Sequence, residues 1–132
     1  MRIGIVGTRE RNTEQDFQIV SQAFSTVVED YAGRKGANSG HPLDDIELVS
    51  GGCPTGADRF AERIAREWQL PITIFYAGWA RHGKGAGFLR NEQIVKRANV
   101  LIACVAVGRK GGTEDTIRRF QRIHPGGKLS LV

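Results

Sequence analysis

At 132 residues the chain has the length of one ordinary domain, and we expect residues 1–132 to form a single domain. Hydrophobic residues make up 40% and charged residues 25% of the sequence, values that exclude wholesale disorder and a fibrous repeat. The longest apolar run, 100–107, is far shorter than the roughly 20 residues of a membrane span, and the first residues lack a cleavable signal. We therefore expect a cytoplasmic protein without membrane contact.

The net charge of +5 is distributed unevenly. Residues 1–53 carry 5 basic and 8 acidic side chains, whereas residues 54–122 carry 13 basic and 6 acidic ones. This basic excess falls where the loops are richest in glycine, and it predicts an anionic partner, either a nucleotide or a nucleic acid. The two cysteines, Cys53 and Cys104, fit neither a disulfide framework nor a metal-ligand spacing, and both are interpreted as reduced structural thiols. No second His, Cys or carboxylate lies at zinc-like spacing from His82, so we predict no metal, and we expect no cofactor.

Strand-like and helix-like segments alternate along the chain. Short β-branched runs predict strands, and apolar residues repeated every three or four positions predict helices. In chain order the expected elements are strand 2–6, helix 13–31, strand 46–49, helix 57–70, strand 72–75, helix 87–97, strand 100–107, helix 113–123 and strand 128–132. Asn12 and Gln15 form an expected capping box for the first helix, Thr113 is an expected cap of the last, and the glycine-rich segment 32–45 is an expected surface loop.

This alternation predicts an α/β fold, a Rossmann-like domain whose parallel five-stranded sheet is flanked by helices. The expected strand order is 3-2-1-4-5. In such sheets ligands bind beyond the carboxyl ends of the strands, where the winding direction reverses. Here that point lies between the first and fourth strands.

The strongest local signal for ligand binding is segment 50–58, between the second strand and the next helix. Gly51, Gly52 and Gly56 would let the backbone approach a phosphate closely, and the helix start favours negative charge. The segment lacks the lysine of a Walker loop and the glycine spacing of the dinucleotide fingerprint. A tight turn, with Asp58 complementing the helix dipole, explains the same residues equally well.

Two further loops are expected at the same sheet edge. Segment 108–113 again places glycines between a strand and a helix, and it adds Arg109 and Lys110. Segment 7–9 follows the first strand, so Arg9 could reach over the edge, although a solvated arginine is the simpler interpretation of that residue alone. Two glycine loops on one edge together favour a phosphate pocket.

Segment 79–92 combines an aromatic side chain, cations and glycines before a helix. Trp79 could stack on a base, although covering the core is the more frequent role of such a residue. Arg90 and Asn91 fall in the first turn of the helix. His82 is interpreted as a solvated loop residue, and nothing resembles the nucleophile elbow of a serine hydrolase.

Together these stretches resemble the YspA-like branch of the SLOG superfamily. The motifs that carry the resemblance are Ser50-Gly51-Gly52, Gly56-Ala57-Asp58, Ala77-Gly78-Trp79, Gly83-Lys84, Ala86-Gly87, Arg90-Asn91-Glu92 and Gly111-Gly112-Thr113. The match runs from the first strand to the last helix. It implies a Rossmann-like domain that binds a nucleotide or a nucleotide derivative, and its relatives include the Lonely Guy phosphoribohydrolases and the DNA-binding DprA proteins.

The resemblance to the Lonely Guy enzymes is incomplete at the catalytic position. Their motif is Pro-Gly-Gly, one residue, Gly-Thr, two residues and a catalytic Glu, with an Arg at the head of the preceding helix. Arg90 matches that Arg, and Gly112-Thr113 matches Gly-Thr, but Thr116 stands where the Glu should be. Glycosidic cleavage needs a carboxylate to stabilise an oxocarbenium-like state. Three carboxylates are candidate catalytic substitutes: Glu92, Glu114 and Asp115.

The leading hypothesis is nucleotide binding, with phosphates on the loops at 51–56 and 111–113, charge neutralised by Arg90 and Arg9, and the sugar or base bonded by Asp58 or Asn91. One alternative is an N-glycosidase or phosphoribohydrolase that uses the same pocket. The other is single-stranded nucleic acid binding, with Trp79 and Phe88 as stacking platforms. A homo-oligomer is compatible with all three. The predicted ligand-binding residues are Gly7, Thr8, Arg9, Ser50, Gly51, Gly52, Gly56, Asp58, Trp79, Lys84, Arg90, Asn91, Gly111, Gly112 and Thr113.

Overall fold

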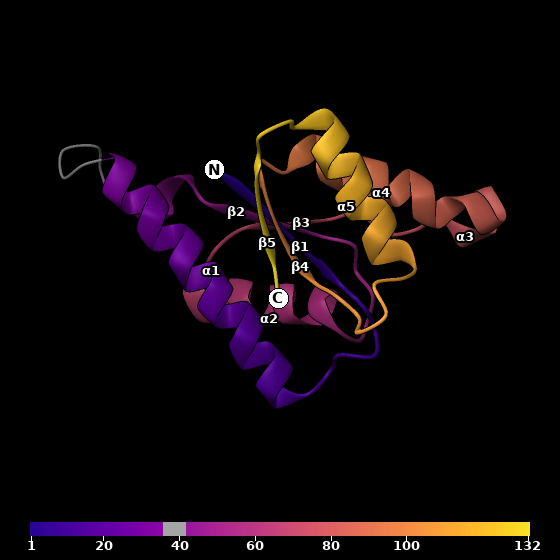
Figure 1. Ribbon diagram of the computed structural model, residues 1–132, viewed down its shortest axis with the longest axis horizontal. Helices are drawn as coiled ribbons and strands as arrows, with labels where there is room; N and C mark the ends of the chain where they lie inside the picture. Colours follow the sequence, from indigo (N-terminus) through magenta and orange to yellow (C-terminus); the bar gives the residue numbers. More distant parts are fainter. Residues whose placement is uncertain (36–41) are drawn as a thin grey trace.

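The computed structural model describes residues 1–35 and 42–132, which form a five-stranded sheet with helices on both faces (Figure 1). The strands are β1 (Arg2–Gly7), β2 (Glu47–Ser50), β3 (Ile72–Ile74), β4 (Val100–Cys104) and β5 (Lys128–Leu131). The helices are α1 (Glu14–Lys35), α2 (Ala57–Trp68), α3 (Trp79–His82), α4 (Ala86–Arg97) and α5 (Gly112–Ile123), with 3-10 turns η1 (Pro42–Asp45) and η2 (Gly83–Gly85). None of these helices is long and apolar enough to cross a membrane.

All neighbouring strands are parallel, in the order β3-β2-β1-β4-β5. The predicted α/β fold and strand order are confirmed. β1 is the central strand, and its Ile3 is in register with Leu48 of β2 on one side and Val100 of β4 on the other. The winding direction therefore reverses at β1 and β4, which is the position where such sheets leave a crevice at their carboxyl ends.

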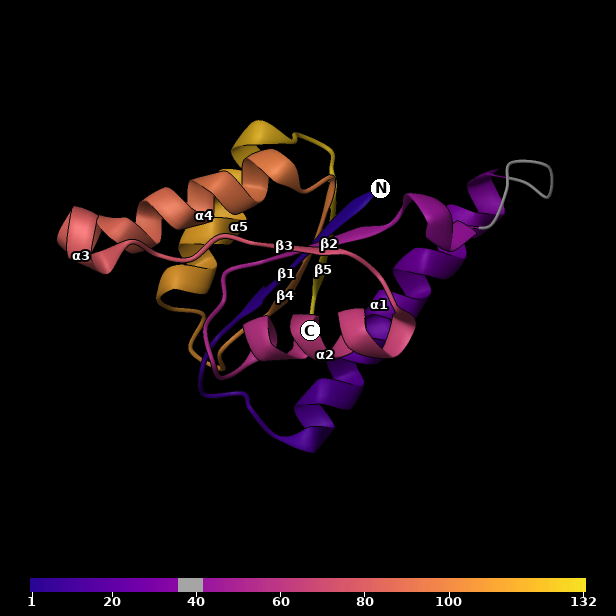
Figure 2. The same cartoon turned by 180° about the vertical axis from the view of Figure 1, so that it is seen from behind.

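Two apolar layers hold the helices on the sheet. α1 and α2 cover one face, and α4 and α5 cover the other, as Figures 1 and 2 show. Ile5 of β1 packs with Phe24 and Ile64 on the first face, and all three are 0% exposed. The next residue, Val6, packs with Phe120 on the second face. Both faces of β1 are buried because successive side chains of a strand point to opposite sides.

The first helix is capped one residue later than predicted. The N–H of Asp16 donates to Thr13 Oγ1 at 3.1 Å, and the N–H of Thr13 donates to Asp16 Oδ2 at 3.2 Å. This reciprocal pair satisfies two backbone donors at the helix start. The predicted capping box of Asn12 and Gln15 was wrong, because the Asn12 amide oxygen accepts a hydrogen bond from the Gly56 N–H at 2.8 Å instead.

Other boundaries also differ from the prediction. α1 continues to Lys35, so the predicted loop 32–45 begins inside a helix and ends in η1, while 36–41 lie outside the described residues. The short helix α3 stands where the sequence predicts a loop. Thr113 does not cap α5, because the cap is Gly111, with φ at 92°, two residues earlier, which makes Thr113 the second residue of the helix.

The end of β1 lies very close to both α2 and β4. A Cβ added to Gly7 would be 2.7 Å from the Cβ of Ala57 and 2.7 Å from the carbonyl oxygen of Cys104. The N–H of Thr8 also donates to that Cys104 oxygen at 3.0 Å. Only glycine allows this approach. It brings the loops after β1, β2 and β4 together at one edge of the sheet.

Candidate functional site

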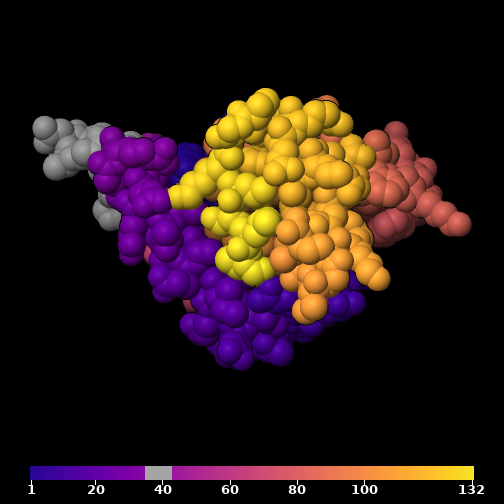
Figure 3. Space-filling model, viewed as in Figure 1, coloured from indigo at the N-terminus to yellow at the C-terminus, as the bar shows by residue number. Residues whose placement is uncertain are grey.

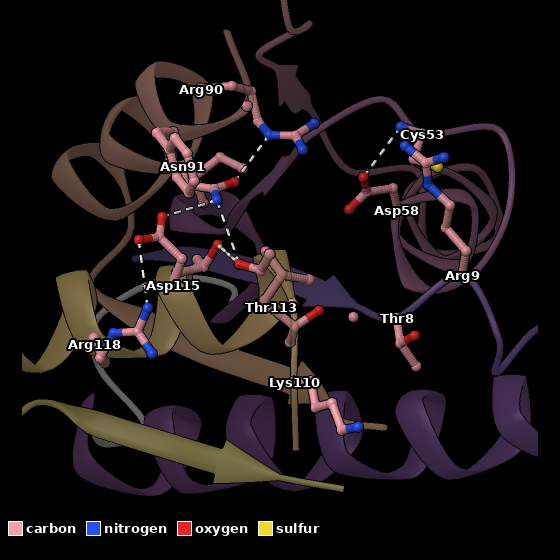
Figure 4. Close-up of a pocket in the computed structure, with 18 of the residues that line it drawn as sticks. Thr8, Arg9, Cys53, Asp58, Arg90, Asn91, Lys110, Thr113, Asp115 and Arg118 are labelled. Atoms are coloured by element: carbon pink, nitrogen blue, oxygen red, sulfur yellow. Dashed lines mark hydrogen bonds and ion pairs between the residues drawn. The ribbon is translucent and has the colours of Figure 1, made fainter. Parts of the chain in front are cut away.

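A cavity of about 810 Å³ opens at the carboxyl edge of the sheet, bounded by the loops after β1, β2 and β4 and by the first turns of α4 and α5. Its volume falls in the range of roughly 300–1,000 Å³ that is typical of small-molecule sites. In Figure 4, Arg9 and Asp58 lie on one side of this cavity, and Asn91 and Asp115 lie on the other. The cavity therefore lies at the edge where the sequence predicts a ligand.

Most of the predicted site residues meet at this cavity. Those that line it are Gly7, Thr8, Arg9, Asp58, Trp79, Lys84, Arg90, Asn91, Gly111, Gly112, Thr113 and Asp115. Those that are not among its lining residues are Ser50, Gly51, Gly52, Gly56, Glu92 and Glu114. The fold thus separates the two glycine loops, because the loop before α5 faces the cavity while the glycines after β2 pack against other parts of the chain.

The carboxylate of Asp58 accepts hydrogen bonds from the backbone of the loop after β2. Its Oδ2 accepts a hydrogen bond from the Cys53 N–H at 3.1 Å, and the backbone of Gly51 also donates to this carboxylate. Asp58 is 8% exposed, and burial raises the pKa of its carboxyl above the ordinary value of 3.8. Two of the backbone donors that could have cradled a phosphate in this loop, those of Gly51 and Cys53, are therefore already bonded to a carboxylate of the protein.

The small residues before Asp58 let the chain pack closely. The buried Ser50 hydroxyl donates to the carbonyl oxygen of Asp58 at 3.3 Å. The carbonyl oxygen of Gly51 accepts a hydrogen bond from Arg90 Nη1 at 2.7 Å, and a Cβ on Gly51 would lie only 2.5 Å from that nitrogen. The absence of a side chain at Gly51 therefore allows Arg90 to reach across from α4 to the loop after β2.

Asn91 joins Arg90 to the start of α5. Its Oδ1 accepts a hydrogen bond from Arg90 Nε at 3.0 Å, and its Nδ2 donates to the Gly112 carbonyl oxygen at 3.3 Å and to Asp115 Oδ2 at 3.1 Å (Figure 4). The residue is 5% exposed. Because an amide has one acceptor oxygen and two N–H donors, these three contacts use each of those groups. Asn91 therefore fixes the positions of Arg90 and of the first turn of α5.

The first turn of α5 faces the cavity through Gly111, Gly112 and Thr113. The first N–H groups of a helix have no partner within the helix, and they carry the positive end of its dipole. Lys110 precedes this turn and Arg118 follows it, and both also line the cavity. This arrangement can bind a compact anion through backbone donors and two flanking cations.

The three candidate catalytic carboxylates are held in ion pairs. Glu92 accepts a hydrogen bond from Arg119 Nη1 at 2.8 Å, and this contact holds the pKa of Glu92 below its ordinary value. Glu114 is paired with Arg109. Asp115 lines the cavity, but its Oδ2 accepts a hydrogen bond from Arg119 Nε at 2.7 Å. Of the three, only Asp115 is placed where it could face a ligand.

Some lining residues were not among the predicted ligand-binding residues: Glu10, Cys53, Lys110, Thr116 and Arg118. Phe88 also lines the cavity, and it was predicted there only for the nucleic-acid alternative, as a stacking platform. Lys110 belongs to the glycine loop 108–113, so its neighbours could have indicated it. Arg118 follows Asp115 by three positions on α5, and its Nη2 lies 3.8 Å from Asp115 Oδ1. Helical spacing would have placed these two residues on the same side of α5.

Replacing Asp58 with asparagine should change how the stability of the protein depends on pH. Because the folded-state pKa of Asp58 is raised, the folded protein binds its proton more tightly than the unfolded chain does. The parent should then lose this contribution to stability as pH rises above about 4. Asp58→Asn has no such proton, so it should gain stability relative to the parent over the same range, as measured by urea unfolding at a series of pH values.

Other carboxylates titrate in both proteins, so the quantity to follow is the difference in unfolding free energy between parent and variant. Asp44→Asn, which removes a carboxylate from the exposed η1 turn, is the control. A difference for Asp58→Asn that stays constant, or that falls as pH rises, would contradict the raised pKa.

Known proteins resemble this chain in sequence over part of its length and in fold over nearly all of it. No protein-family model matches the sequence. The Gene 61 protein of Mycobacterium phage D29 is 34% identical over 82 residues, which cover 58% of this chain and 65% of the phage protein. A solved structure of DNA processing protein A from Helicobacter pylori, described for its single-stranded DNA binding mode, has a TM-score of 0.66 at 17% identity. The chain shares the fold of this DNA processing protein.

This structural match covers 99% of the present chain and 64% of the Helicobacter chain. The present chain therefore spans less than two thirds of both similar proteins. DNA processing protein A is the DprA relative that the sequence resemblance named, and its likeness to this chain is a likeness of fold. Within residues 1–35 and 42–132, no group of three or more His, Cys, Asp and Glu side chains is arranged to hold a metal ion.

Proposed function

We propose that the protein binds a nucleotide or a nucleotide derivative, as a member of the YspA-like branch of the SLOG superfamily, with the phosphate at the amino end of α5. The observation that supports this most directly is the difference between the two glycine loops. Asp58 is bonded to backbone N–H groups of the loop after β2, whereas Gly111, Gly112 and Thr113 face the cavity. This difference favours the loop before α5 over the loop after β2 as the phosphate site.

The charges around the cavity support the same proposal. Five cationic side chains line it: Arg9, Lys84, Arg90, Lys110 and Arg118. Three carboxylates also line it: Glu10, Asp58 and Asp115. Cationic side chains therefore outnumber carboxylates in the lining, so its formal charge is positive, which favours an anionic ligand.

Calorimetric titration tests this proposal with a panel of nucleoside 5′-monophosphates, each compared with its nucleoside. Mass spectrometry of small molecules released from the purified protein identifies further ligands to titrate. We expect the monophosphates to bind roughly tenfold or more tightly than the nucleosides, because charge-assisted hydrogen bonds to the phosphate are lost in the nucleoside. Equal affinity for the two would place the binding energy elsewhere and contradict the phosphate site.

The same samples also test turnover. Because Thr116 stands at the position of the Lonely Guy glutamate, we expect at most slow release of free base from the monophosphates, measured by chromatography. Rapid release that Asp115→Asn abolishes would support the phosphoribohydrolase alternative. Asp115 is the variant to use because it is the one candidate carboxylate among the cavity-lining residues.

Single-stranded DNA binding is the second candidate function, because the Helicobacter protein with the same fold is described for that activity. A single strand that crosses several cationic side chains would show an affinity that falls steeply with salt, in proportion to the number of phosphate contacts. For a nucleotide site we expect weak binding of an oligothymidylate. Tight binding that persists at physiological salt would favour the DNA-binding candidate.

A further inference from the structure

Two large aromatic side chains stand exposed beside the cavity. Trp79 of α3 is 55% exposed and Phe88 of α4 is 53% exposed, and both line the cavity. The other tryptophan, Trp68, packs against Phe24 in the core, with ring centroids 5.0 Å apart at 86°. Trp79 therefore does not cover the core, and its apolar surface faces the cavity and solvent.

The indole of Trp79 is positioned by a glycine. A Cβ added to Gly87 would lie 3.3 Å from Trp79 Cη2 and 4.0 Å from Cζ2, so the six-membered ring lies against the backbone of the first turn of α4. An alanine at Gly87 would require the ring to shift by a few tenths of an ångström, and a larger side chain would require more. In Figures 1 and 3 the segment that contains α3 and the start of α4 projects beyond α5 at one end of the molecule.

The Trp79 ring lies one helical turn from the groups that meet at the phosphate end of the cavity. Arg90 follows Gly87 by three positions on α4, so the two lie on the same side of the helix, about 4.5 Å apart along its axis. Asn91 then links Arg90 to Gly112 at the start of α5. The Trp79 ring, the Arg90 guanidinium and the amino end of α5 therefore line the same cavity, in that order.

We propose that the indole of Trp79 is the stacking surface for the base of the bound nucleotide, and that Gly87 is the positioning residue that holds this indole in place. The inference rests on the proposed function, since it requires the phosphate at α5. Aromatic faces bind purines and pyrimidines alike, because every base presents a π-face. The subsite therefore selects ligands that carry a heteroaromatic base, with little preference among the bases.

The chain offers a direct optical test, because it contains two tryptophans. In Trp68→Phe, Trp79 is the remaining tryptophan, and its emission reports on the proposed subsite. We expect adenosine and uridine 5′-monophosphates to quench this emission, and ribose 5-phosphate to bind without quenching it. Trp79→Ala should bind the monophosphates roughly fivefold to 100-fold more weakly, the loss expected for one base–aromatic stack, while its affinity for ribose 5-phosphate stays the same.

Gly87→Ala and Gly85→Ala form a matched pair from the same segment. A Cβ on Gly85 meets no atom within 4 Å, so Gly85→Ala should bind like the parent. Gly87→Ala should bind nucleotides roughly twofold to tenfold more weakly because the ring must move, while retaining its melting temperature, since alanine favours the helix. Weaker nucleotide binding at an unchanged melting temperature would show that the ring has moved while the fold is intact.

The outcomes also separate this inference from the function on which it rests. If calorimetry detects nucleotide binding, but Trp79 emission and the affinity of Trp79→Ala do not change, the stacking inference is wrong and nucleotide binding stands. If ribose 5-phosphate binds and the nucleotides bind no more tightly, the base subsite is absent. If neither class of ligand binds, both proposals are overturned.

Discussion

Gly112→Val should weaken binding of nucleoside monophosphates roughly 100-fold or more, the equivalent of about two charge-assisted hydrogen bonds. Gly112 is the first residue of α5, and it lines the cavity. A branched side chain there would occupy the space through which a phosphate approaches the N–H groups of the first turn. Calorimetric titration of parent and variant measures the change in affinity.

The structure indicates that Gly112→Val will fold. A Cβ on Gly112 meets no atom within 4 Å, whereas a Cβ on Gly52 would lie 2.5 Å from Tyr76 Cε1, at a φ of 73° that disfavours side chains. Gly112→Val is therefore the informative variant of the two, and Gly52→Val is expected to strain the fold itself. Gly33→Val, also in a helix and with no atom near its added Cβ, is the matched control and should bind like the parent.

An unchanged affinity for Gly112→Val, with the fold confirmed by circular dichroism, would exclude the start of α5 as the phosphate site. Loss of binding in the Gly33→Val control as well would show that the effect is not specific to this cavity. These two measurements use the same protein preparations as the titrations that test the proposed function.

Arg90→Ala should weaken binding of the monophosphates by about 1.5–3 kcal/mol, roughly 10-fold to 150-fold, the usual contribution of a hydrogen bond to a charged group. The guanidinium is half-buried and is oriented by the Gly51 carbonyl oxygen at 2.7 Å and by Asn91 Oδ1 at 3.0 Å. Being oriented before the ligand binds, it loses little conformational freedom on binding. Arg90→Lys should recover part of the affinity, because it keeps the charge but not the planar fork.

Arg34→Ala is the control for the loss of one positive charge, because Arg34 lines a separate cavity together with Met1 and Asn99, away from the proposed site. Its affinity for the monophosphates should match that of the parent. If Arg34→Ala loses binding while Arg90→Ala retains it, the ligand lies at the opposite edge of the sheet. Thermal unfolding of both variants shows whether a change in affinity reflects a change in stability.

The sequence by itself determined the fold and the edge at which the site lies. The alternation of β-branched runs with helical periodicity predicts parallel strands joined by right-handed crossovers, and the order β3-β2-β1-β4-β5 follows from those connections. The loops after β1, β2 and β4 were placed together for the same reason. Local pattern is sufficient here because period and chain connectivity restrict the possible topologies to a few.

Only the tertiary structure decided what each polar group at that edge is bonded to. Asp58 and Asn91 both looked available for a ligand in the sequence, but Asp58 is bonded to the backbone of its own loop, and Asn91 joins two helices. Glu92 looked equally available and is paired with Arg119, 27 positions away. Hydrogen-bond partners depend on which side chains packing brings within about 3 Å, and spacing along the chain does not encode that distance.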